Sequence, residues 1–143
     1  MNGIQLKILG AMAALALTAM PALRADDDGC STRSLKGAFG YSVRGVTPAN
    51  MQFAAVGRIV FDGQGQVTTV RSLSNGGTIA KNDTGSGTYV LGSDCRGSFS
   101  IVAAGLGQLL VDMVVSAGGN ELRGIVTNPG FVLTLEGSRQ QGK

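Results

Sequence analysis

The sequence predicts an all-β fold, an eight-stranded antiparallel up-and-down β-barrel, and three observations support this class. Beyond the N-terminal stretch, no segment carries apolar residues at helical spacing. Short runs of alternating apolar and polar residues follow one another instead, and glycine-containing turns separate them. Every connection is short, so consecutive runs pair, and a twisted sheet of that many strands curls until its edges meet. A two-sheet sandwich with the same meander connections is the alternative.

The N-terminal stretch is typical of a secretory signal peptide. Lys7 opens it, an apolar segment follows over 8–17, and small residues end it over 18–25. We expect residues 1–25 to be removed and residues 26–143 to form a single β-barrel domain that is exported, either to the periplasm or outside the cell. Part of the net charge of +3 leaves with the signal, so the sequence predicts no nucleic-acid partner. Aromatic residues make up only 5% of the chain, fewer than the interfacial girdles of a membrane barrel require, so we expect no stable membrane insertion after cleavage.

The cysteine and histidine content limits the chemistry. The chain has two cysteines, Cys30 and Cys95, and no histidine. In an oxidising compartment we expect the two cysteines to form a disulfide, which closes a loop of about 65 residues and stabilises the fold by up to ~4 kcal/mol. Imidazole-based metal sites and histidine-activated nucleophiles are excluded. We predict no metal and no cofactor.

Nine runs have the composition of strands, and they are taken in chain order: 37–46, 51–61, 66–74, 78–81, 86–91, 95–103, 108–116, 121–127 and 130–137. We merge 78–81 with 86–91 into one long strand that is bent or bulged at 82–85, which leaves eight strands.

Two hairpin turns set the register of the last three strands. With Gly118-Gly119 as a two-residue turn, Val115 faces Leu122 and Val111 faces Val126. With Asn128-Pro129 as the next turn, Gly124 faces Leu133 and Leu122 faces Leu135. Both registers place the same side of strand 121–127 on the apolar face.

Arg71 is the most informative polar candidate. If Gly63-Gln64-Gly65 is a three-residue hairpin loop, Gly57 faces Arg71 and the arginine points into the barrel. An inward guanidinium is suited to anchor a ligand carboxylate. A four-residue loop instead turns Arg71 outward.

Several large side chains share the predicted inward face and are candidates to line a ligand pocket together with Arg71: Tyr41, Met51, Phe53, Tyr89, Met113 and Phe131. The alternative is that they fill a barrel of this strand number, which has little spare interior.

A group of charges falls on the opposite, outward face. Arg123 is expected opposite Thr134 and close to three carboxylates, those of Asp112, Glu121 and Glu136. Paired carboxylates with an arginine could serve acid/base chemistry. A solvated ladder of weak cross-strand ion pairs is the interpretation that we favour.

Three stretches together resemble a known group of proteins. They are Cys30 with Leu-Lys-Gly-Ala-Phe-Gly-Tyr at 35–41, the hairpin segment 55–65, and Gly-Thr-Tyr at 87–89 followed by Cys-Arg-Gly at 95–97. In this order they resemble exported bacterial proteins with an allene oxide cyclase-like barrel, within the broader lipocalin-like architecture. The motifs are turns and strand starts, so the resemblance implies a fold and transfers no catalytic residue to this chain.

Three functions are compatible with these features. The first is a binding module for a small apolar or amphipathic molecule, the second a cyclase or isomerase that confines its substrate in the barrel, and the third a structural or surface protein without a ligand. A closed cavity of some hundreds of Å³ would favour the first two over the third. The sequence does not indicate an oligomeric state.

Overall fold

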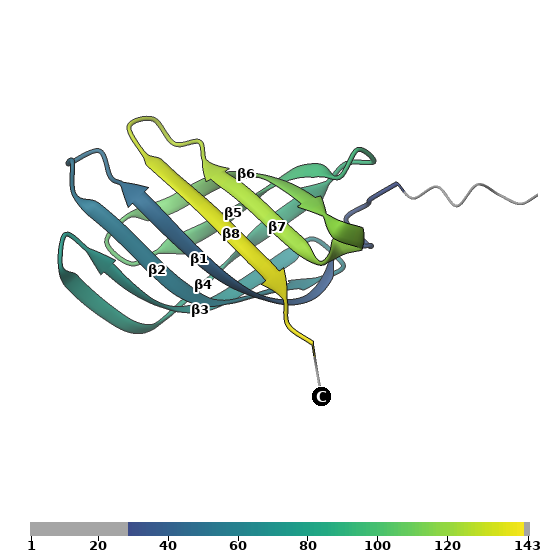
Figure 1. The fold of residues 1–143 in the computed structure, drawn as a ribbon, viewed down its shortest axis with the longest axis horizontal. Coiled ribbons are helices and arrows are strands. Elements are labelled where there is room, and N and C mark those ends of the chain that lie inside the picture. The colour runs from purple at the N-terminus through teal and green to yellow at the C-terminus, as the bar shows by residue number, and fades with distance from the viewer. Residues whose placement is uncertain (1–28, 142–143) are drawn as a thin grey trace, which may run out of the picture.

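The structure, a computed structural model, describes residues 29–141, so the predicted signal peptide lies outside the described residues. Eight antiparallel strands form one closed barrel in chain order, and β8 pairs back onto β1 to close it (Figure 1). This confirms the predicted barrel and rules out the sandwich. The strands are β1 (Lys36–Val46), β2 (Gln52–Asp62), β3 (Gln66–Asn75), β4 (Thr78–Leu91), β5 (Arg96–Ala103), β6 (Gly107–Ser116), β7 (Glu121–Val126) and β8 (Val132–Arg139).

Strand β4 joins the two runs that the sequence analysis merged. Its register against β3 shifts between the pairs Arg71↔Asp83 and Leu73↔Ala80, so β4 carries one extra residue there. Asn82 adopts a φ of 52° within this bulge. Asparagine tolerates the left-handed region better than most residues, which suits it to the position.

The β6–β7 hairpin has the predicted register, with Val115 opposite Leu122. Gly118 and Gly119 have φ values of 65° and 89°, as a turn at these glycines requires. The loop is wider than predicted, because a short 3₁₀ turn, η1 (Ala117–Gly119), forms and the Asn120 amide donates to the Ser116 carbonyl at 3.1 Å.

The predicted β7–β8 register is wrong by two residues. Gly124 lies opposite Leu135, rather than Leu133. The turn centres on Pro129-Gly130, where proline fixes the first turn position and Gly130 takes a φ of 83° at the second, the pattern of a type II turn. A shift of two keeps each side chain on its own face, so Leu133 and Leu135 remain buried as predicted.

One end of the barrel is covered by the segment before β1. The Cys30–Cys95 disulfide ties this segment to the β4–β5 turn, with the two Cα atoms 4.9 Å apart, as predicted from the cysteine count. Leu35, the last residue of this segment, is buried, and the Tyr89 hydroxyl donates to its carbonyl at 2.6 Å. We call this the sealed end. The β1–β2, β3–β4, β5–β6 and β7–β8 connections lie at the opposite end (Figure 1), and we call it the open end because the segment before β1 does not cover it.

Four aromatic rings fill the half of the barrel next to the sealed end. Phe61 packs edge-to-face on its three neighbours, with centroid separations of 4.9 to 6.0 Å, and the partners are Phe39, Tyr89 and Phe99. Such contacts are favourable and leave little space between the rings. Any room for a ligand must therefore lie toward the open end.

No helix within residues 29–141 has the length and apolar character needed to cross a membrane.

Candidate functional site

The Arg71 side chain points into the barrel, as the three-residue loop predicts. The β2–β3 register pairs Phe61 with Val67 and Gly57 with Arg71, and only 5% of Arg71 is exposed. A Cβ atom on Gly57 would lie 2.7 Å from the Arg71 Cβ atom and would clash with the Val70 carbonyl oxygen. Glycine at position 57 is therefore what allows β3 to approach so closely at the arginine.

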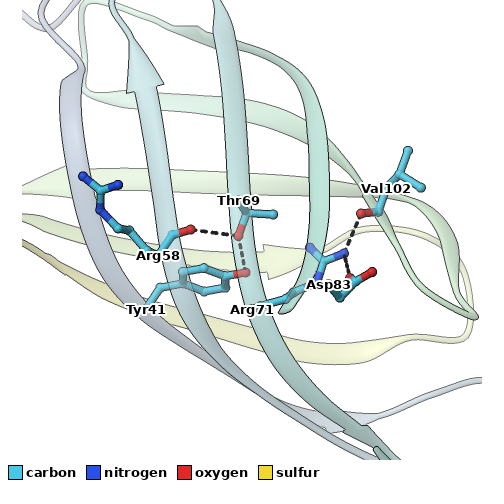
Figure 2. Close-up of polar contacts among 6 residues, drawn as sticks. All are labelled: Tyr41, Arg58, Thr69, Arg71, Asp83 and Val102. Atoms are coloured by element: carbon cyan, nitrogen blue, oxygen red, sulfur yellow. Dashed lines mark hydrogen bonds and ion pairs between the residues drawn. The ribbon is translucent and has the colours of Figure 1, made fainter. Parts of the chain in front are cut away.

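Arg71 is held by an ion pair with β4 and by a hydrogen bond to β5. Its Nη2 atom lies 2.6 Å from Asp83 Oδ2 on β4 and donates to the Val102 carbonyl on β5 at 2.6 Å (Figure 2). The β4–β5 ladder pairs only residues from Tyr89 to Leu91 with β5, so it ends before it reaches Val102. The guanidinium thus bridges the two strands where their ladder has stopped, and Asp83 balances its charge.

The Nε atom of Arg71 differs from Nη2, because it is buried without a hydrogen-bond partner among the described residues. An unpaired buried donor carries a desolvation penalty, so such an atom requires an explanation in a native site.

Tyr41 and Thr69 form the second polar pair inside the barrel. Their hydroxyl oxygens are 2.7 Å apart, and the Thr69 hydroxyl donates to the Arg58 carbonyl at 3.0 Å (Figure 2). Since the threonine proton is used there, Tyr41 must be the donor to Thr69. The Tyr41 ring has room because Gly57 on β2 and Gly137 on β8 both lie opposite it.

These polar groups border an apolar cleft toward the open end. The cleft holds about 30 Å³ of free volume, enough for one or two water molecules. Ligand pockets usually measure about 300–1,000 Å³. The interior is therefore mostly filled, and this cleft is far smaller than the large preformed cavity that would favour a carrier or a confining enzyme. Besides Arg71, Thr69 and Tyr41, the lining is apolar and includes Val43, Phe53, Ala55, Ala103, Leu109 and Val126.

The predicted lining residues divide into three groups. Tyr41, Phe53 and Arg71 border the cleft. Tyr89 and Met113 are buried but do not border it, and Phe131 is half-buried against the core. For Met51 the predicted inward position is wrong, because this residue precedes β2 in the β1–β2 turn, where it is 39% exposed and covers Gly76.

The sequence analysis missed Asp83 and Thr69. Asp83 lies in segment 82–85, which the sequence predicts to be bent or bulged, and its inward direction follows only from the position of the bulge. The inward position of Thr69 could have been predicted from the sequence. Residues alternate between the two faces of β3, so Thr69 shares one face with Val67 and Arg71.

The outward charge cluster behaves as a solvated surface. Asp112, Glu121, Arg123 and Glu136 are exposed. Arg123 lies opposite Glu136, rather than Thr134 as predicted, because the β7–β8 register differs by two. The ion pair that Glu136 forms is with Arg44 at 3.8 Å, and both side chains are largely exposed. An open surface of this kind lacks the enclosure that acid/base catalysis requires.

Asp62 and Tyr89 have shifted pKa values, and neither residue borders the cleft. The pKa of Asp62 is lowered by the amides of Gln66 and Gln64, which donate to its carboxylate in the β2–β3 loop. Burial raises the pKa of Tyr89.

Residues 29–141 contain no cluster of three or more His, Cys, Asp or Glu side chains that could hold a metal ion.

Comparison with protein-family models, with curated proteins and with solved structures found no match. The resemblance to allene oxide cyclase-like barrels therefore stays a prediction.

Proposed function

We propose that this protein is an exported barrel, periplasmic or extracellular, that binds a slim apolar or amphipathic molecule at its open end. The observation that carries the proposal is the apolar cleft with the buried Arg71 at its edge, whose Nε donor has no partner among the described residues. A few polar groups in an otherwise apolar recess are the usual composition of small-molecule sites. The disulfide is compatible with export.

The free volume limits the ligand. Because about 30 Å³ is available, a bulky ring system does not fit without extensive rearrangement, whereas a single hydrocarbon chain needs only side-chain movement. Val43, Leu106 and Phe131 pack against the core but are only half-buried, so they are the side chains best placed to move aside.

A second candidate is a structural or surface protein without a ligand, and the same small volume favours it. A barrel whose interior is filled by its own side chains needs no ligand to be stable. Substrate confinement by a cyclase or isomerase has weaker support, because it requires a cavity that encloses the whole substrate.

Native mass spectrometry of the protein purified from its own host separates these candidates. A binding module should carry a co-purifying small molecule, and it should melt at a higher temperature when straight-chain probes are added. The structural candidate predicts a single mass and a melting temperature that no probe changes.

A matched pair of variants on β2 locates the site. Ala55 borders the cleft, and its neighbour Ala54 is exposed on the outer face. Ala55→Leu should fill the cleft and abolish the probe-induced rise in melting temperature, whereas Ala54→Leu should retain it. The melting temperature of each variant without probe serves as the folding control. Equal responses of the two variants would place binding elsewhere or exclude it.

A further inference from the structure

We infer that the cleft selects ligands whose polar group is a neutral hydrogen-bond acceptor, a carbonyl, hydroxyl or ether oxygen, over ligands with a carboxylate, and that Asp83 sets this preference. The inference rests on the proposed function and names its ligand class. It replaces the carboxylate anchor that the sequence suggested for Arg71.

The charge of Arg71 is already balanced inside the barrel. Asp83 Oδ2 lies 2.6 Å from Nη2, and the two side chains are 5% and 16% exposed. Arg71 is the one charged side chain among the described residues that border the cleft. An incoming carboxylate would therefore meet a neutral ion pair, and it would lose its hydration close to the like charge of Asp83.

One hydrogen-bond donor remains available beside the cleft, although the charge of Arg71 is balanced by Asp83. The Arg71 Nε atom is buried without a partner within residues 29–141. The hydroxyl protons of Tyr41 and Thr69 are used by Thr69 and by the Arg58 carbonyl. A neutral oxygen that accepts from Nε removes the desolvation penalty of this donor and brings no charge into the apolar recess.

The test compares three eight-carbon probes, octan-2-one, octan-1-ol and octanoate, against the wild-type protein at neutral pH. Their affinities are measured by NMR titration, with the Arg71 Nε–H signal as the local readout. The ketone and the alcohol should bind about tenfold or more tightly than octanoate and should shift this signal, since an unpaired charge costs more than a neutral acceptor gains. Equal or tighter binding of octanoate would overturn the inference while leaving the proposed function standing. Absence of binding by all three probes would refute both.

Variants of Asp83 and Arg71 test whether Asp83 sets the preference for neutral ligands over carboxylates. Asp83→Asn removes the like charge and should move the preference toward octanoate, whereas Asp112→Asn, the same change on the exposed outer face, should leave it unchanged. Where Asp83→Asn fails to fold, Arg71→Lys keeps a cation for Asp83 but has no Nε–H. This variant should bind the ketone about tenfold less tightly, and unchanged ketone affinity would refute the role of Nε.

Discussion

At the scale of single residues, the glycine at position 57 of β2 leaves space for the large Arg71 side chain, which lies opposite it on β3 and points into the barrel. The missing side chain at position 57 lets β2 and β3 approach closely at the point where Arg71 turns inward. The guanidinium then reaches across β4 to the Val102 carbonyl. The buried polar site thus depends on a glycine that does not itself border the cleft.

Gly57→Ala should destabilise the protein by about 1–3 kcal/mol, because the added methyl group overlaps the Val70 carbonyl and the Arg71 side chain. Chemical denaturation measures the effect. Gly40→Ala on β1 is the control, since its nearest neighbour would be the Gln140 side chain at 3.7 Å, an ordinary contact. Equal midpoints for the two variants would show that β2 relaxes around position 57.

At the scale of the elements, turn chemistry decides which strand residues face one another. The β2–β3 hairpin has the three-residue Gly-Gln-Gly loop, one of the two loop lengths that the sequence left open. The β7–β8 hairpin does not follow Asn128-Pro129, because proline followed by glycine is the stronger type II signal and moves the turn by one residue. When a turn moves by one residue, each β7 residue pairs with a β8 residue two positions further along. Every side chain therefore keeps its inward or outward direction, although its cross-strand partner changes.

Gly118 offers a test of turn conformation that packing does not complicate. Its φ is 65°, and nothing lies within 4 Å of the position that a Cβ atom would occupy. Gly118→Val should therefore lower stability by about 1–2 kcal/mol or more through backbone strain alone. Gly118→Asn should cost less, because asparagine tolerates this region. Identical denaturation midpoints for the two variants would contradict the left-handed conformation of the turn.

At the scale of the whole molecule, the closed sheet and the Cys30–Cys95 disulfide both stabilise the fold. The barrel leaves no unpaired sheet edge between β1 and β8, and the Cys30–Cys95 bond ties down the segment that covers the sealed end. A small domain has a total stability of about 5–15 kcal/mol, so one long-range cross-link is a large part of it.

The double variant Cys30→Ser/Cys95→Ser should lose about 2–4 kcal/mol, because the unfolded chain regains the freedom of the loop between residues 30 and 95. Thermal unfolding under oxidising conditions measures the loss. Wild-type protein treated with a reductant should unfold at the same temperature as the double variant. A double variant as stable as the oxidised wild type would show that the cross-link adds no stability.

The sequence by itself determined the eight strands, their inward faces and the disulfide, because each follows from local alternation, from turn residues or from the cysteine count. It left the direction of Arg71 open between two loop lengths, and the β2–β3 register of the structure decided that this side chain points inward. Only the tertiary structure decided that Asp83 and the Val102 carbonyl hold Arg71 and that the interior is mostly filled. Those facts depend on where a single bulge falls in β4 and on how tightly the closed sheet curves. Both are set by contacts between strands rather than by the residues of any one strand.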